Sequence, residues 1–244
     1  MSDSRTSEKA ATRGCPSYVW RAGQERRMDL VRRWVDMAGR RVLDVGCGVG
    51  MYTGAFLHET PAVYGVEVEY ERVLQARERA TGVVQGVGEQ LPFLDGVFDI
   101  VFSHEVLEHV DDDQRCAAEM VRLTRPGGRL VIFVPNRLYF FETHGIYWRG
   151  IYRFGNMPGV NWLPTRLRDR LAPHVRAYTG RGLRRLFAEL PVRVVHHTQI
   201  FPGYDNIVAR WPLLGRLLRR VTYALEHTPL RCFGISHVLI LERL

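Results

Sequence analysis

The sequence predicts an α/β fold built on a parallel, doubly wound sheet. Short apolar strands alternate along residues 41–135 with stretches of about 10–15 residues that favour helix. The first strand, at residues 41–45, runs directly into three glycines at alternate positions, Gly46, Gly48 and Gly50. A strand, a glycine-rich loop and a helix in this order are typical of sheets that bind a ligand at their carboxyl edge.

Hydrophobic periodicity and turn residues place the elements of this alternating region. Residues 21–38 carry apolar side chains at helical spacing, which predicts a helix over the edge of the sheet. Three aspartates at 111–113 favour the start of a helix, and Pro126-Gly127-Gly128 stops that helix. Two further helices are expected at 51–59 and 71–80, and four further strands at 62–68, 83–85, 98–104 and 130–134.

The alternation ends after Pro135. Residues 136–178 are rich in aromatic residues, Pro, Gly and Arg, and they predict a long, partly helical segment of the kind that usually carries function. A helix at 182–190, a strand at 193–200, a basic helix or pair of helices at 211–226 and a strand at 237–242 should follow. We therefore expect a disordered tail at 1–15 and a single domain at 16–244, with a substrate-side insertion at 136–178 and a basic helical segment at 204–235.

Composition narrows the class of protein. No apolar run reaches the roughly 18 residues of a membrane span, and the polar N-terminus has no apolar leader segment. The four cysteines lie far apart and form no C-x-x-C pair, so neither a zinc site nor a disulfide framework is indicated. Cys47, inside the glycine loop, is interpreted as a small residue that fits there. We expect a cytoplasmic protein.

The net charge of +8 is unevenly distributed. The segment from Arg137 to Arg220 holds 15 arginines against four acidic residues, and Lys9 is the only lysine of the chain. Guanidinium groups suit phosphate and carboxylate recognition better than ammonium groups do. The second half is therefore where we expect an anionic acceptor, or the membrane surface that carries it.

The basic helix at 211–226 has an apolar stripe beside its arginines. Apolar and cationic faces on one helix suit an anionic membrane surface. They equally suit a helix that packs on its own domain and extends its arginines into water. The sequence leaves both interpretations open. The stripe consists of Leu213, Leu214, Leu217, Leu218 and Val221, with Arg216, Arg219 and Arg220 beside it.

Two acidic residues, Asp44 and Glu67, end predicted strands and could contact a ligand bound at the glycine loop. Asp44 closes the first strand and can accept hydrogen bonds from a cationic or hydroxylated ligand. Glu67 ends the next strand, 17 residues after Gly50, a position from which a carboxylate accepts hydrogen bonds from ribose hydroxyls. Glu69 is the alternative, two residues further along the chain.

Further motifs carry a resemblance to a known family. Residues 41–50 read RVLDVGCGVG, residues 86–93 read GVGEQLPF, and residues 98–110 read FDIVFSHEVLEHV. Together with Arg125-Pro126-Gly127-Gly128, they resemble the class I S-adenosylmethionine (SAM) methyltransferases of the ubiquinone/menaquinone-biosynthesis type, also called methyltransferase type 11. The resemblance covers about residues 40–135. It implies a Rossmann-like fold of seven strands, mostly parallel with an antiparallel last strand, and SAM as the cofactor.

The resemblance also implies roles for single residues. The family has an Asp that contacts the adenine amino group where this chain has Val87, so adenine recognition is expected to pass to Gly88 and Glu89. His104, after the fourth strand, is placed beside the methionine part of SAM. The implied cofactor residues are Asp44, Gly46, Cys47, Gly48, Gly50, Glu67, Val87, Gly88, Glu89 and His104.

The segment at 136–178 supplies the candidates for catalysis and acceptor binding. An imidazole has an ordinary pKa of about 6.5, so His144 is the candidate base for an acceptor hydroxyl. Its alternative role is to pin the segment by hydrogen bonds. The candidate acceptor-binding residues are Arg137, Tyr139, Glu142, Trp148 and Arg149.

The predicted function is methyl transfer from SAM to a small-molecule or lipid-linked acceptor that is expected to be anionic, on oxygen rather than carbon or nitrogen. Glu108-His109 could serve acid–base chemistry or a metal, but the family implies a structural role, and no metal is predicted. Methylation of RNA, suggested by the basic half, is one alternative; a non-catalytic SAM-binding protein is another. No motif for RNA binding is present in the sequence.

Overall fold

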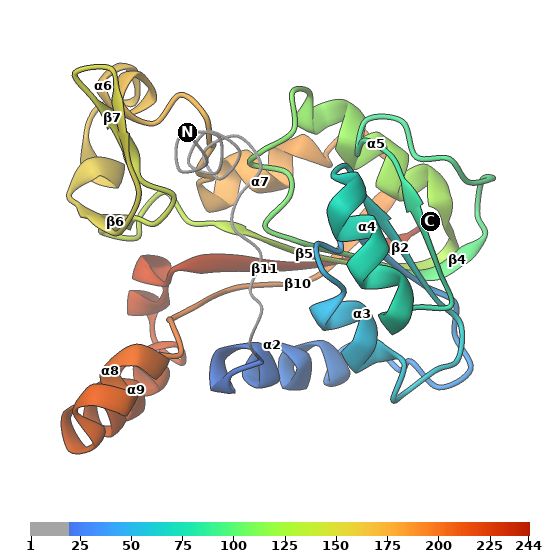
Figure 1. Ribbon diagram of the computed structural model, residues 1–244, viewed down its shortest axis with the longest axis horizontal. Coiled ribbons are helices and arrows are strands. Elements are labelled where there is room, and N and C mark those ends of the chain that lie inside the picture. The colour runs from blue at the N-terminus through green and yellow to red at the C-terminus, as the bar shows by residue number, and fades with distance from the viewer. Residues whose placement is uncertain (1–19) are drawn as a thin grey trace.

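The computed structural model describes residues 20–244, so the expected tail at 1–15 lies outside the described part. Its centre is one sheet of seven strands in the order β10-β11-β5-β4-β1-β2-β3 (Figure 1). The strands are β1 (Val42–Val45), β2 (Val63–Glu67), β3 (Gly82–Gln85), β4 (Phe98–His104), β5 (Thr124–Pro135), β10 (Val192–Ile200) and β11 (Ser236–Arg243).

Strand directions confirm the predicted fold class. Strand β1 pairs in parallel with both β2 and β4, and β4 pairs in parallel with β5. Strand β11 inserts between β5 and β10 and is antiparallel to both. The order of the strands reverses between β1 and β4, and in open sheets a ligand binds at the carboxyl ends of the strands at such a point.

Helices cover both faces of the sheet (Figure 1). On one face, Met28 of α2 and Phe56 of α3 pack in one apolar cluster with Phe133 of β5. On the other face, Met120 of α5 and Leu183 of α7 join a second cluster. Burial of each side chain of this size stabilises the folded state by about 1.5–3 kcal/mol. The helices are α2 (Ala22–Arg32), α3 (Met51–Phe56), α4 (Tyr70–Ala76), α5 (Asp113–Leu123) and α7 (Gly180–Leu186).

The first helix is shorter than its apolar spacing predicts. It ends at Arg32 rather than at residue 38, and the chain then turns toward β1. Val35 and Met37 are nonetheless buried, with exposed fractions of 5% and 2%. Their side chains reach the core from irregular backbone, so the same apolar pattern serves packing without a helix.

Residues 136–178, which we call the substrate-side segment, contain more strand than the sequence predicts. Two short antiparallel pairs, β6 with β9 and β7 with β8, precede its helix. These strands have two or three residues each, too few to show an alternating pattern. The segment lies beyond the end of β5 (Figure 1). Its elements are β6 (Phe141–Glu142), β7 (Ile146–Trp148), β8 (Ile151–Arg153), β9 (Met157–Pro158), η2 (Val160–Trp162) and α6 (Thr165–Leu171).

The basic region near the C-terminus forms a pair of helices, α8 (Asp205–Arg210) and α9 (Pro212–Leu225), that projects from the domain (Figure 1). Gly215 lets them meet, since a Cβ there would lie 2.6 Å from the Val208 backbone. The apolar stripe of α9 is largely uncovered, with Leu213 80% exposed and Leu217 60% exposed. Within residues 20–244, no helix has the length and apolar character needed to cross a bilayer.

Candidate cofactor and acceptor site

A cavity of about 630 Å³ opens at the carboxyl edge of the sheet, where β1, β2 and β4 end. Of the ten residues that the motifs predict for the cofactor, all but Gly50 line it. Gly50 instead is the N-cap residue of α3, with a φ of +82°, and a Cβ there would lie 3.0 Å from the Cα of Ala76. The predicted residues at the cavity are Asp44, Gly46, Cys47, Gly48, Glu67, Val87, Gly88, Glu89 and His104.

The loop after β1 is built from left-handed glycines. Gly46 has a φ of +71° and Gly48 a φ of +56°, values that residues with a Cβ rarely adopt. A Cβ on Gly46 would also lie 2.4 Å from a methyl group of Val106. The side chain of Cys47 packs against Gly65. This contact agrees with the expectation that Cys47 is a small residue that fits into the loop. The alternate glycines thus allow a tight turn at the cavity wall.

Glu67 is tied to this loop by backbone hydrogen bonds. Its carboxylate accepts one from the Gly48 amide at 2.9 Å and one from the Glu69 amide at 3.0 Å. Glu67 is buried and faces the cavity, whereas Glu69 does not line the cavity and pairs with Arg72 at 3.3 Å. The structure therefore brings the first of the two candidate carboxylates, Glu67, to the glycine loop.

Asp44 lies buried behind the loop, where its carboxylate accepts a hydrogen bond from the Thr53 hydroxyl at 2.8 Å. Burial raises the pKa of Asp44 to about 7, and the nearby Glu67 charge adds to the effect. Asp44 is therefore a buried acceptor that would gain from a cationic or hydrogen-bond-donating ligand in the cavity.

The next wall comes from the loop after β3. Val87 is 46% exposed and offers an apolar surface where the family has an acidic side chain. A Cβ on Gly88 would lie 2.7 Å from the Cys116 sulfur, so the backbone there packs directly on α5. One carboxylate oxygen of Glu89 accepts a hydrogen bond from the Asp111 amide at 2.8 Å. Backbone groups and the remaining Glu89 oxygen are thus the polar groups of this wall.

His104 ends β4 inside an aromatic cluster, with its ring centre 4.9 Å from that of Tyr52. Its Nε2 is buried and has no hydrogen-bond partner among residues 20–244. Burial lowers its pKa to about 4, which keeps the imidazole neutral. Buried polar atoms usually have a hydrogen-bond partner, so this nitrogen at the cavity wall is suited to bind a polar group of a ligand.

The side chain of His144 projects from the substrate-side segment into the same cavity. Its Nδ1 lies 3.1 Å from a Glu142 oxygen, and the other Glu142 oxygen accepts a hydrogen bond from Arg168 at 2.7 Å. Glu142 and Arg168 are both buried. A buried ion pair thus orients the imidazole, so His144 is held by a hydrogen bond within its own segment and also reaches the cavity.

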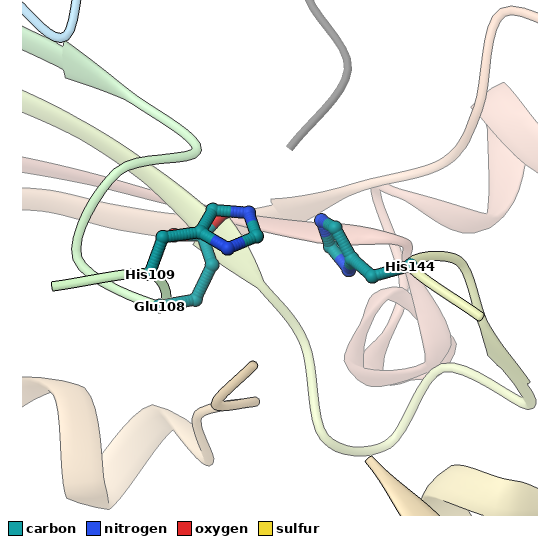
Figure 2. Close-up of side chains that lie close together, drawn as sticks. All are labelled: Glu108, His109 and His144. Carbon is teal, nitrogen blue, oxygen red and sulfur yellow. The ribbon is translucent and has the colours of Figure 1, made fainter. Parts of the chain in front are cut away.

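Three residues from two distant parts of the sequence meet at this wall. The ring centres of His109 and His144 lie 5.1 Å apart, and Glu108 lies beside them (Figure 2). Burial lowers the pKa of His109 to about 3, while burial and the Glu105 charge raise the pKa of Glu108 well above its usual value. Glu108 and His109 are adjacent in the sequence, but nothing in the sequence joins them to His144, because 34 residues separate the two histidines.

None of the five predicted acceptor-binding residues lines this cavity. Arg137 donates a hydrogen bond to the Leu163 carbonyl and borders a second cavity of about 910 Å³. Trp148 is the last residue of β7 and Arg149 follows in the turn to β8, and both side chains are exposed. The ring of Tyr139 packs on another ring of the segment, and Glu142 is enclosed by its own partners. The segment instead contributes Thr143, His144 and Phe154 to the cavity.

Comparison with known proteins confirms the resemblance that the motifs carry. Residues 43–132 match the family described as methyltransferase domain. An uncharacterized methyltransferase of Mycobacterium sp. (strain JLS) is 42% identical over 96 residues, or 38% of each chain. A ubiquinone biosynthesis O-methyltransferase of Xanthomonas oryzae pv. oryzae is 36% identical over 118 residues, or 46% of this chain and 49% of that protein. The chain thus spans less than half the length of these curated relatives.

Solved structures show the same fold over most of the chain. A SAM-dependent methyltransferase from Mesorhizobium loti superimposes with a TM-score of 0.63 at 18% identity, over 88% of this chain and 96% of its own. The [4+2]-cyclase SpnF superimposes with the same TM-score of 0.63 at 15% identity, over 98% of this chain and 92% of its own. At these identities, the likeness establishes the fold alone.

Proposed function

We propose that this chain is a SAM-dependent methyltransferase that modifies an oxygen of a small-molecule or lipid-linked acceptor. The observation that carries the proposal is the convergence of nine motif residues on one cavity at the carboxyl edge of the sheet. The cavity size also fits, because small-molecule and cofactor sites typically have about 300–1,000 Å³.

The residues at the cavity fit the parts of SAM. We assign the ribose hydroxyls to Glu67, whose carboxylate keeps acceptor capacity beyond the two backbone amides it already binds. The exposed Val87 side chain and the Gly88 backbone suit the adenine ring. The methionine part is assigned to the wall made by Gly46 and His104, where the His104 Nε2 lacks a partner among the described residues.

When bound, SAM supplies a methyl group on a sulfonium that is itself a good leaving group. The chain therefore needs mainly to align the acceptor and to exclude water, and orientation of this kind supplies roughly 7–11 kcal/mol in favourable cases. His144 is the candidate base, because Glu142 binds its Nδ1 and leaves Nε2 to accept a proton. Thr143 and Phe154 of the same segment border the space for the acceptor.

The acceptor class rests on three observations. The named relative from Xanthomonas methylates oxygen in ubiquinone biosynthesis by its description. The second half of the chain is rich in arginine, which favours an anionic acceptor. The exposed stripe of α9, with Leu213 and Leu217, suits a peripheral contact with an anionic membrane that holds a lipid-linked acceptor. We propose a cytoplasmic protein with such a contact.

Two alternatives remain as outcomes of the test. The arginine-rich half would also favour RNA as the acceptor, and the cyclase of the same fold shows that this architecture serves reactions other than methyl transfer. Incubation of the protein with methyl-labelled SAM and extracts, followed by mass spectrometry, identifies the labelled product. Label in a small molecule or lipid supports the proposal, whereas label in RNA, or SAM binding without any labelled product, contradicts it.

Cofactor binding is tested by titration of SAM against Gly48→Ala and against the matched variant Gly127→Ala. Both glycines have a positive φ, +56° and +75°, so both substitutions strain the backbone similarly. Only Gly48 lies at the cavity. We expect Gly48→Ala to weaken SAM binding by about tenfold or more and Gly127→Ala to leave it unchanged. Equal affinities in both folded variants would contradict the assignment of the loop.

A further inference from the structure

We propose that Glu108, His109 and His144 bind a divalent transition-metal ion at the acceptor side of the cavity. Each of the three offers one ligand atom, and these atoms all lie within 4.8 Å of one another (Figure 2). Ligands about 2.0–2.2 Å from one tetrahedral ion lie about 3.3–3.6 Å apart, so the three side chains would have to close by about 1 Å to bind it together. The spacing of these residues in the sequence predicts no metal, because His144 lies far from Glu108 and His109 along the chain.

Unpartnered polar atoms point to a ligand at this cluster. Glu108 is 1% exposed, and among residues 20–244 no cation and no amide, hydroxyl or imidazole donor reaches its carboxylate oxygens, which face a second carboxyl group, that of Glu105. The Nδ1 of His109 is likewise buried and unpartnered within the described part of the chain. A buried acceptor left without a donor costs about 1–3 kcal/mol, and more if it is charged. A cation would satisfy these acceptors together.

The orientation of His144 supports the same conclusion. Its Nδ1 is bound to Glu142 at 3.1 Å, and Glu142 is itself fixed by Arg168 at 2.7 Å. Metal-binding histidines commonly bind a carboxylate through one ring nitrogen and the metal through the other. In this tautomer, the Nε2 lone pair of His144 is free to bind an ion.

Glu105 is placed to complete the ligand set. One of its oxygens accepts a hydrogen bond from the Ser236 hydroxyl at 3.1 Å, and the other lies 3.8 Å from the His144 Nε2. Its φ of +57° is unfavourable for a residue with a Cβ, so the fold holds it in a strained conformation at this wall. Two imidazoles and one or two carboxylates leave coordination positions for water or for an oxygen of the acceptor.

The donor set selects the class of ion. Imidazole nitrogens suit Zn²⁺, Fe²⁺ and Ni²⁺, whereas Ca²⁺ and Mg²⁺ prefer sites built from oxygen alone. We therefore infer a first-row transition ion, with Zn²⁺ as its probe. The role of the ion rests on the proposed function: its charge would favour the deprotonated form of an acceptor hydroxyl, whose proton passes to solvent water. The ion would then replace His144 as the group that activates the acceptor.

The test is calorimetric titration of the full chain with Zn²⁺ after removal of metals with EDTA. We expect one equivalent to bind, and His144→Ala and Glu108→Gln each to weaken binding by at least about tenfold. His58→Ala, on an exposed histidine remote from the cluster in the sequence, serves as the matched control and should bind as the parent chain does. Ca²⁺ should bind more weakly than Zn²⁺.

A second measurement, the absorption spectrum of bound Co²⁺, reports which side chains coordinate the ion. Bound Co²⁺ should give a visible absorption spectrum that changes in His144→Ala and stays unchanged in His58→Ala. No Zn²⁺ binding by the parent chain, or equal binding by the parent and both cluster variants, would overturn the site. SAM titration of the same samples separates the two proposals, since Zn²⁺ binding without SAM binding contradicts only the proposed function, and SAM binding without Zn²⁺ binding contradicts only the metal site.

Discussion

The two walls of the cavity are held in place by different means. At the glycine loop, the backbone amides of the loop itself make the contacts: the Gly46 and Cys47 amides donate to the Val66 carbonyl of β2, and the Gly48 amide donates to the Glu67 carboxylate. At the substrate-side segment, side chains make them, since Glu142 binds both His144 and Arg168. The first wall depends on main-chain shape, and the second depends on the identity of a few buried side chains.

This difference predicts where each wall is vulnerable. A loop fixed by its own backbone tolerates many sequences as long as glycine stands at the left-handed positions. A wall fixed by a buried ion pair fails when either partner is lost, because the remaining charge has no solvent to stabilise it. We therefore expect variants of the segment to affect folding and variants of the loop to affect cofactor affinity.

The largest effect is expected from Arg168→Leu, which leaves the buried Glu142 without its cationic partner. Loss of one partner of a buried pair costs about 3–5 kcal/mol, so the free energy of unfolding in urea should fall by that amount. The double variant Arg168→Leu with Glu142→Leu should recover most of it. A single variant as stable as the parent chain would show that the two walls do not differ in this way.

Next in size is the loss of SAM affinity in Glu67→Gln. A hydrogen bond to a charged group is worth about 1.5–3 kcal/mol, and we expect the dissociation constant to rise by roughly tenfold to a hundredfold. Glu69→Gln is the matched control, since Glu69 pairs with Arg72 and does not line the cavity. A larger effect from Glu69 than from Glu67 would transfer the ribose contact to Glu69.

A smaller effect on stability is expected from His237, which contacts the end of the substrate-side segment. His237 Nε2 contacts the Tyr178 carbonyl at 2.9 Å, and burial lowers the pKa of His237 to about 4. The unfolded chain then binds more protons than the folded one between pH 6.5 and 4, so stability is full above this window and falls as pH falls through it. We expect His237 to account for about 2 kcal/mol of the stability that the chain loses between pH 7 and 5, so the loss should be smaller by about that amount in His237→Gln. Urea unfolding at the two pH values measures it.

The smallest effect on the fold is expected outside both walls, on α9. Leu213 and Leu217 are mostly exposed, so the double change to Ser should alter the free energy of unfolding by no more than about 0.5 kcal/mol. If the stripe contacts membranes, the same variant should lose sedimentation with anionic liposomes at low salt. Sedimentation of the parent chain with neither anionic nor neutral liposomes would rule out this contact.

Much of the first wall could be predicted from the sequence, because the requirements of a glycine loop are local. The alternate glycines after β1, the acidic residue at the end of β2 and the antiparallel last strand implied by the resemblance all appear in the structure. Local backbone conformation depends on the nearest residues, and parallel strands bring their carboxyl ends together whatever lies between them.

The residues that form the second wall could not be predicted from the sequence, because long-range packing selects them. The sequence pointed to Arg137, Trp148 and Arg149 for the acceptor, but the fold turns these residues away from the cavity and brings His144 beside Glu108 and His109 instead. Such contacts join residues dozens of positions apart through strands too short to leave a periodic pattern. The fold and the glycine loop follow from local sequence patterns, whereas long-range packing selects the side chains that line the far wall of the cavity.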